Sequence, residues 1–374
     1  MNYPPQGPPP QGPLPGNFGA PQGHPGQWGP PPQQPPWPQQ QWPPSPPPKK
    51  RNGWKWALGA VALLTVIGVT AAVTISVTSG GDGGDPTPAE ETYGLASADD
   101  RGPVDIIRED PSCAVWAPVN DAFAAVQKKG WSKRDPTVPR SQWTFDQRTQ
   151  FEEVGRAARE AAERTVTAAK LTPHRVMREL YLQFIAYARA YSDSLDSYEP
   201  HDESLARVMT NSGAAIIYAC AAINFGSAAA RGPLVEPGPT PSIFAPLQNP
   251  EEPTQFLANG DSVCSDWIEL LEKYDAETED WQAIDSAISS SDWTPEQRTT
   301  IDKTIPKFIA LADSLEDLGR KTSNAWVQDF AFVAAQYRRA YAEALPTYTA
   351  ADSWLASTAG SVGSTVYNAC QAAS

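Results

Sequence analysis

An internal repeat at a spacing of 150 residues constrains this chain more than any other feature of its sequence. The run SQWTFDQR at 141–148 returns as SDWTPEQR at 291–298, and YARAY at 187–191 returns as YRRAY at 337–341. Further residues keep the same spacing, namely Trp131 with Trp281, Asp202 with Asp352, Leu205 with Leu355, Gly213 with Gly363, and Cys220 with Cys370. Because the register holds over such a length without a gap, we infer two copies of one domain.

The two copies, residues 112–230 and 262–374, show helical periodicity and almost no strand signal. Apolar residues recur at every third or fourth position after Thr144 and Thr294, and each threonine opens a T-x-x-Q capping box. Each copy is therefore expected to contain four helices. The predicted fold class is all-α, with two tandem four-helix bundles joined by a Pro-rich linker at 231–261.

The four cysteines support this arrangement and predict two disulfides. Cys113 and Cys264 each open the first helix of a copy, whereas Cys220 and Cys370 each end the last helix. In an up-down-up-down bundle these two points lie at the same end of the bundle. Of the three possible connectivities we therefore expect Cys113–Cys220 and Cys264–Cys370, in a compartment that favours disulfides.

Residues 56–78 (WALGAVALLTVIGVTAAVTISVT) form an uncharged apolar run directly after a basic stop at 49–55. The 23 residues would rise about 34 Å as a helix, enough to cross a hydrocarbon core about 30 Å thick. The alternative is a cleaved signal peptide, but the run begins 55 residues into the chain and no A-x-A cleavage site follows it. We predict a single-pass anchor in the lipid bilayer of the plasma membrane, with the N-terminus cytoplasmic and the C-terminal domain extracytoplasmic.

The segments on either side of the apolar run have unusual compositions. Residues 1–48 contain 20 Pro, nine Gln and no acidic or basic residue, which predicts a disordered cytoplasmic arm. Its P-x-x-P spacings fit a cytoplasmic protein partner, and a solvated tail without a partner is the other interpretation. Residues 79–111 are rich in Gly, Asp and Pro and are expected to form a flexible tether.

No pattern in the sequence predicts catalysis or a bound cofactor. The histidines His24, His174 and His201 do not have the spacing of metal ligands, and no G-x-S-x-G, phosphate-binding loop or dinucleotide fingerprint occurs. Residues 81–374 contain 43 acidic and 25 basic residues, a balance that repels nucleic acid. We expect a protein that is not an enzyme, with no cofactor, no metal and no nucleic-acid partner.

Aromatic residues concentrate on the third helix of each copy and allow two interpretations. They can fill the core, with their hydroxyls at the bundle edge, or they can line a groove for a lipid tail, a glycan or a partner helix. The repeated C-x-x-W and W-T-x-x-Q-R sequences also have two interpretations, because they can serve helix capping and disulfide formation or can mark a binding face. The groove candidates are Tyr181, Tyr187, Tyr191, Trp326, Tyr337 and Tyr341.

The layout of residues 1–90 resembles that of proline-rich single-pass membrane proteins of mycobacteria and related actinobacteria. A neutral PPQGPPP-type arm, a KKR stop and one anchor precede an exterior domain with paired cysteines. The resemblance is one of organisation, and residues 112–374 match the motifs of no characterised family. It implies a cell-envelope location and a role in cell-wall or transport machinery.

Two functions of different classes follow for the exterior domain. The leading hypothesis is a non-enzymatic scaffold or interaction module that contacts envelope proteins. The alternative is a carrier or sensor that binds an apolar envelope ligand, such as a lipid, between helices. A cavity lined by the aromatic residues would favour the carrier, and a solid core with an exposed contact surface would favour the scaffold.

Overall fold

The computed structural model describes residues 91–374, and within this range the regular structure is helical, without a strand. Four long helices in each copy agree with the expected number. The first repeat contains α2 (Ser112–Gln127), α3 (Phe145–Leu171), α4 (Arg175–Ser194) and α5 (Glu203–Asn224), and the second contains α7 (Cys264–Glu277), α9 (Pro295–Lys321), α10 (Ala325–Ala344) and α11 (Ser353–Ala372). The short helices α6 (Ser227–Arg231) and α8 (Glu279–Gln282) and several single 3-10 turns complete the two repeats.

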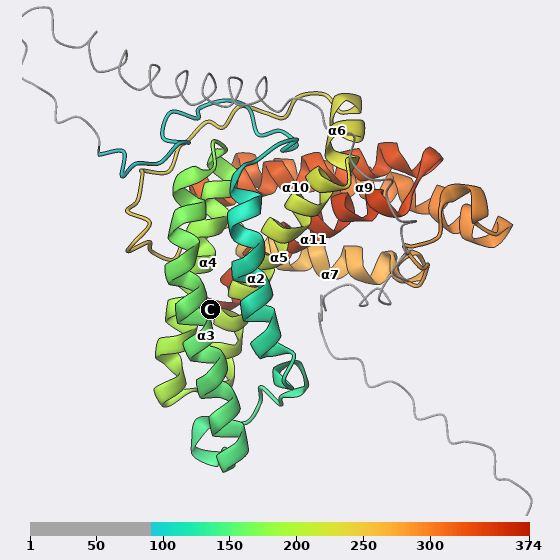
Figure 1. Cartoon of the computed structure of the whole chain (residues 1–374). Helices are drawn as coiled ribbons and strands as arrows, with labels where there is room; N and C mark the ends of the chain where they lie inside the picture. The colour runs from blue at the N-terminus through green and yellow to red at the C-terminus, as the bar shows by residue number, and fades with distance from the viewer. Residues whose placement is uncertain (1–90) are drawn as a thin grey trace, which may run out of the picture. The chain divides into compact units, whose positions relative to one another are not determined.

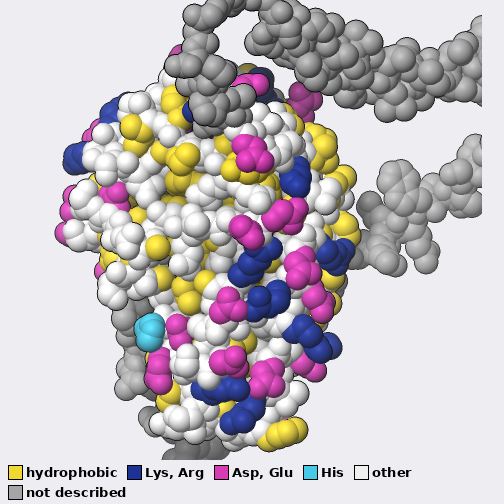
Figure 2. All heavy atoms as spheres, turned by 90° about the vertical axis from the view of Figure 1, so that its left-hand side faces the viewer, with side chains coloured by type: hydrophobic (Ala, Val, Ile, Leu, Met, Phe, Trp, Pro, Cys, Tyr) yellow, Lys and Arg dark blue, Asp and Glu magenta, His cyan; other side chains and the backbone are white. Residues whose placement is uncertain are grey.

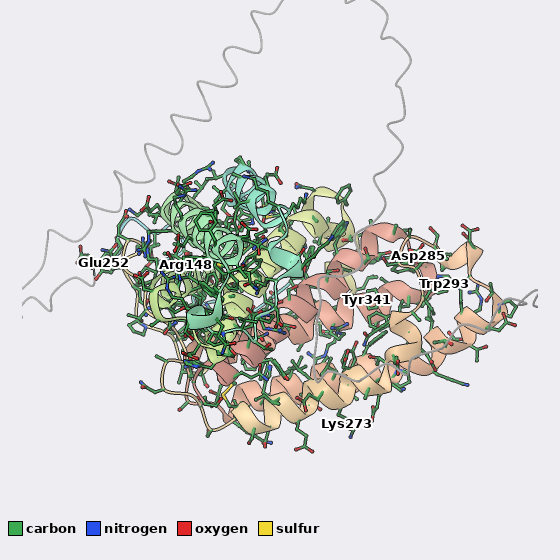
Figure 3. All side chains as sticks on the ribbon, turned by 90° about the horizontal axis from the view of Figure 1, so that it is seen from below. Arg148, Glu252, Lys273, Asp285, Trp293 and Tyr341 are labelled. Atoms are coloured by element: carbon green, nitrogen blue, oxygen red, sulfur yellow. A yellow bond between two sulfur atoms is a disulfide. The ribbon has the colours of Figure 1, made fainter. Side chains whose placement is uncertain are left out.

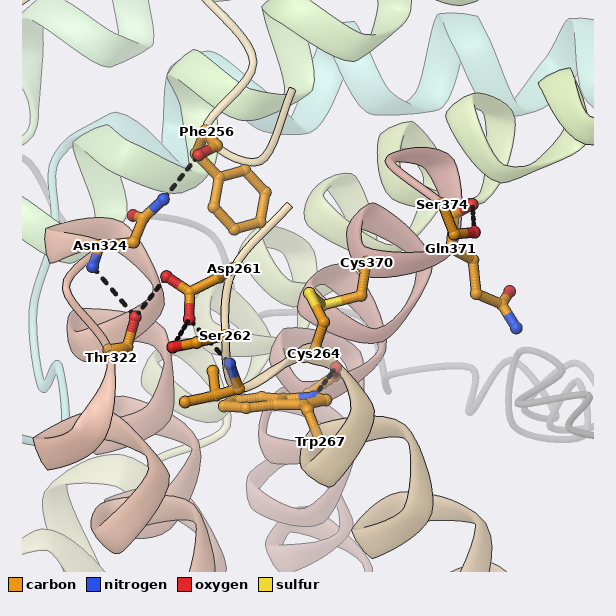
Figure 4. The surroundings of a disulfide bond; sticks show 12 residues. Phe256, Asp261, Ser262, Cys264, Trp267, Thr322, Asn324, Cys370, Gln371 and Ser374 are labelled. Atoms are coloured by element: carbon orange, nitrogen blue, oxygen red, sulfur yellow. Dashed lines mark hydrogen bonds between the residues drawn. A yellow bond between two sulfur atoms is a disulfide. The ribbon is translucent and has the colours of Figure 1, made fainter. Parts of the chain in front are cut away.

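In each repeat the four long helices form a bundle (Figure 1). Helices that follow one another in the chain pack together, and the first helix also contacts the last. The disulfides Cys113–Cys220 and Cys264–Cys370 join these two helices, with Cα–Cα distances of 5.5 and 5.4 Å. The predicted pairing is confirmed, and Figure 4 shows the second disulfide beside Trp267, whose indole nitrogen donates to the carbonyl of Gly363.

The two longest helices, α3 and α9, begin at the predicted capping boxes. Thr144 and Thr294 accept a hydrogen bond from the backbone N–H of Gln147 and Gln297, and each glutamine side chain accepts one from its threonine N–H. Pro295 occupies the first helical position of α9, where a missing N–H has no cost. Local sequence therefore determines where these helices start.

The two repeats pack directly against each other through α5 and α11, which make the most extensive helix–helix contact in the described part of the chain (Figure 1). Both helices bury many small residues, which allow two helices to approach closely. The small buried residues include Ala206, Ser212, Ala215, Ala219 and Ala222 on α5, and Ala359, Ser364 and Ala369 on α11.

Residues 200–224, which include α5, are long and apolar enough to cross a membrane by length and composition, and no other helix among residues 91–374 meets that test. More than half of this stretch is buried, and α5 packs against α4 and α11. A central position in the core accounts for its composition. The apolar run at 56–78, the basic stop at 49–55 and the Pro-rich arm at 1–48 lie outside the described residues.

Residues 95–110 differ from the expectation of a flexible tether over 79–111. Leu95, Val104, Ile106 and Ile107 are buried in the hydrophobic core. Two hydrogen bonds, from Val104 N–H to the carbonyl of Pro239 and from Ile107 N–H to the hydroxyl of Tyr337, tie the segment to the linker and to α10. The apolar residues within a Gly/Asp/Pro-rich sequence explain the difference, because they bury surface that a solvated tether would expose. We call residues 95–110 the N-terminal strap.

The linker makes the corresponding contact with the first repeat. The side chain of Gln183 on α4 donates to the carbonyl of Thr254 and accepts from the N–H of Phe256, at 3.1 and 3.0 Å. The ring of Phe256 lies between Tyr187 and Phe330, which belong to different repeats. The N-terminal strap, which leads into the first repeat, thus contacts the second repeat, and the linker, which leads into the second repeat, contacts the first. The two repeats are therefore interlocked as well as packed.

Candidate functional site

The six aromatic groove candidates are core residues of the bundles. Each is no more than 7% exposed. Burial raises the pKa of every tyrosine among them above the ordinary range of a phenol. In Figure 3 Tyr341 lies inside the second repeat, whereas Lys273 on α7 points away from it. The structure therefore agrees with the core-packing interpretation.

The hydroxyls of these tyrosines have partners within the protein. Tyr191 and Tyr341 accept from the indole N–H of Trp131 and Trp281 at 3.3 and 3.2 Å, so the repeat conserves this pair in space as well as in sequence. Tyr181 lies 2.9 Å from the hydroxyl of Ser112. Satisfied hydroxyls allow aromatic rings to fill a core without a desolvation penalty.

A cluster of charged residues joins α4, α10 and the N-terminal strap. Arg175 on α4 donates to both carboxylate oxygens of Asp329 on α10, at 2.7 and 3.3 Å. The same guanidinium donates to the carbonyls of Asp100 and Gly102 in the strap. Because Arg175 and Asp329 are almost fully buried, this ion pair is a specific link between the two repeats rather than a surface contact.

Glu179 completes this cluster at a position related to Asp329 by the repeat. Its spacing from Asp329 is 150 residues, so the junction brings together equivalent positions of the two copies. Burial, and secondly the negative charge of Asp329, raise the pKa of the Glu179 carboxyl well above its usual range. The positive charges of Arg178 and Arg175 oppose this rise in the pKa of Glu179.

The described residues hold no group of His, Cys, Asp and Glu side chains that could bind a metal ion. His174 lies at the surface beside the carbonyl of Glu109, and His201 is exposed next to Asp202. The structure does not bring either histidine together with a nucleophile and a carboxylate. The charge cluster instead serves assembly, because each of its groups faces another element of the fold.

A surface hollow with a volume of about 550 Å³ lies beside the linker, against α9 and α10. Leu234, at its rim, is 54% exposed. A second hollow of about 340 Å³ shares the segment 234–237 and Gln336 with the first. The first hollow is lined by Leu234, Val235, Glu236, Pro237, Pro239, Ile309, Glu316, Arg320, Gln336, Arg339 and Glu343.

The two repeats differ strongly in charge despite their common fold. Residues 112–230 contain 13 acidic and 14 basic residues, whereas residues 262–374 contain 17 acidic and eight basic residues. Figure 2, which shows the side of the molecule formed largely by the first repeat, has acidic and basic side chains interspersed. The second repeat therefore presents an acidic surface that the first repeat lacks.

Comparison with known proteins identifies the family. A family model described as "Mycobacterial ESX-1 associated protein" matches residues 95–374, which is the whole of the interlocked domain. The chain belongs to this family. An uncharacterized protein of Mycolicibacterium smegmatis (strain MKD8) is 46% identical over 335 residues, covering 87% of this chain and 88% of that relative. No solved structure matches.

The family match begins at the first buried residue of the N-terminal strap, Leu95. The family thus includes the strap, both repeats and the linker as one unit. Its description concerns association with ESX-1 and names no enzymatic activity.

Sequence reasoning missed the residues that join the repeats, namely Arg175, Arg178, Glu179 and Asp329. One signal was available: Glu179 and Asp329 match at the repeat spacing. From the sequence alone, acidic residues at equivalent positions of two copies are expected to lie on the surface. Only the packing of α4 near α10 shows that the two carboxyl groups meet.

Proposed function

We propose that this chain is a non-enzymatic accessory protein of the mycobacterial cell envelope that acts as a scaffold for protein partners of the ESX-1 secretion system. The family match over the entire described domain carries this proposal. In this proposal residues 56–78 anchor the chain in the plasma membrane, the Pro-rich arm stays in the cytoplasm, and residues 95–374 contact partners outside. The two disulfides fit such an oxidising location.

The architecture supports a scaffold in two respects. First, the α5–α11 contact, the buried Arg175–Asp329 pair and the crossing segments hold the two repeats in one arrangement. A rigid arrangement lowers the entropic cost of binding a partner at more than one place. Second, the repeats carry different charge, so one domain offers two surfaces of different specificity.

The alternative, a carrier for an apolar ligand, is less well supported. The six aromatic residues that would line a lipid site pack against other parts of the protein. Native mass spectrometry of the full chain, released gently from detergent, tests the alternative directly. A retained mass of lipid size would favour the carrier, and a bare chain or one bound to another polypeptide would favour the scaffold.

A deletion strain tests the proposed scaffold. A mycobacterium that lacks this chain should secrete less ESX-1 substrate, and expression of the full chain should restore secretion. A chain that ends at residue 94 keeps the arm and the apolar run and is the matched control, which should fail to restore secretion. Secretion that is unchanged by the deletion, or that is restored by the control, would overturn the proposal.

A further inference from the structure

Linker residues 251–256 lie against Lys170 of α3 and against α4 in the first repeat, and we call this contact surface the first groove. Lys170 pairs with the Glu251 carboxylate at 3.1 Å, and Arg189 donates to the carbonyl of the same residue. Gln183 binds the main chain farther along, at Thr254 and Phe256. This groove therefore binds an extended Pro-flanked segment mainly through its main chain, and Lys170 pairs with its acidic side chain.

The groove between α9 and α10 of the second repeat carries basic residues at the equivalent positions and contains a hollow beside the linker residues 234–239. The spacing of 150 residues relates Lys170 to Arg320 and Arg189 to Arg339, and both arginines line the hollow of about 550 Å³. Ile309 and the half-exposed Leu234 supply an apolar surface beside them.

The charge of the second groove is opposite to that of the first. Arg320 and Arg339 are already paired with acidic residues of α9 itself, namely Asp313, Glu316 and Asp317. The arginines therefore keep no net charge with which to attract an acidic segment.

Glu343, at the rim of the hollow, lacks the basic partner that its counterpart in the first repeat has. Its counterpart in the first repeat, Asp193, pairs with Arg159. The position of Arg159 is occupied by Ile309 in the second repeat, which leaves Glu343 without that cation. Glu236 adds another carboxylate to the lining, so the hollow combines an apolar floor with an acidic rim.

We propose that this α9–α10 groove binds an extended segment of a partner protein that carries a basic side chain next to an apolar one. The basic side chain pairs with Glu236 and Glu343, and the apolar side chain packs on Ile309. Arg339 binds a main-chain carbonyl, as Arg189 does in the first repeat. The inference rests on the proposed function, in that it identifies the class of segment by which the exported domain engages its partner.

Two peptides built on the linker sequence test the proposal with the full chain in detergent. The probe is LQNPKKPTQF, which is residues 247–256 with both glutamates replaced by lysine, and the matched control is the unaltered LQNPEEPTQF. The first groove is covered by the covalently attached linker, whose high effective concentration excludes either peptide. Fluorescence anisotropy of labelled peptide should show roughly tenfold or greater preference for the lysine peptide.

Charge reversal in the groove identifies the binding site. The double variant Glu236→Lys with Glu343→Lys should abolish the preference for the lysine peptide or turn it toward the acidic one. The control variant Glu160→Lys with Glu163→Lys alters two exposed acidic residues of α3 and should leave the preference unchanged.

Equal affinity for both peptides, or a preference that survives Glu236→Lys with Glu343→Lys, would overturn the assignment. Self-association of the full chain that disappears in that double variant would instead place a second copy in the groove and would also overturn it. Neither result affects the proposed scaffold, which the secretion assay tests separately. If the groove prefers the lysine peptide but deletion of the chain leaves secretion unchanged, the proposed scaffold is refuted and the assignment of the groove stands.

Discussion

Removal of one disulfide tests how the first repeat is held together. We consider the paired substitution Cys113→Ala with Cys220→Ala, because both sulfurs are buried and alanine introduces no unpaired polar group. The sequence separation of 107 residues means that the bond closes a loop of nearly the full length of the repeat. Without the bond, the unfolded chain regains the conformational freedom that this loop had removed.

The expected loss of stability follows from the loop length. The chain-entropy relation gives about 4.8 kcal/mol for a loop of this size at 25 °C, and losses of about 2–5 kcal/mol are typical when native disulfides are removed. The second disulfide has a separation of 106 residues, so Cys264→Ala with Cys370→Ala should cost nearly the same. Because the two loops do not overlap in sequence, the losses should add when both bonds are removed.

Urea denaturation of the full chain, followed by circular dichroism at a helix band, measures this loss. The helices of residues 112–372 supply the signal. Each paired variant should unfold at a clearly lower urea concentration with little change in the slope of the transition. A loss of less than about 1 kcal/mol would refute the loop-entropy argument, as would unequal losses for the two disulfides.

Three further substitutions test the junction and the packing. Glu179→Gln should raise the free energy of unfolding at pH 7, because burial raises the pKa of the native Glu179 carboxyl above its value in the unfolded chain. Wild-type stability should therefore fall as the pH rises above about 4.5, and urea titrations should show the advantage of the variant vanishing near that pH. Arg175→Met should cost about 3–5 kcal/mol and speed amide exchange in the N-terminal strap, whereas Arg159→Met, at an exposed pair, should cost less than about 1 kcal/mol. Gly319→Ala should cost about 1–3 kcal/mol by thermal melting, because its Cβ would lie 2.7 Å from Phe332 and 2.8 Å from Ala331, and an unchanged melting temperature would contradict this.

Much of the fold could be predicted from the sequence because it depends on local or repeated signals. The capping boxes at Thr144 and Thr294 determine where two helices begin, and the cysteines stand where a bundle brings helix ends together. The candidate groove could not be predicted in this way. Leu234 and Glu236 belong to an irregular linker, and nothing in their spacing indicates that they lie against Ile309.

The sequence by itself determined the two copies, their helices and the disulfide pairing, because helix signals act over one or two turns and the repeat shows each of them twice. Only the tertiary structure decided that α5 packs on α11, that the N-terminal strap is buried, and that Glu179 meets Asp329 beside Arg175. These features depend on contacts between residues about 70 to 230 positions apart. Side chains at such separations meet only after the helices have packed, so no local pattern records their partners.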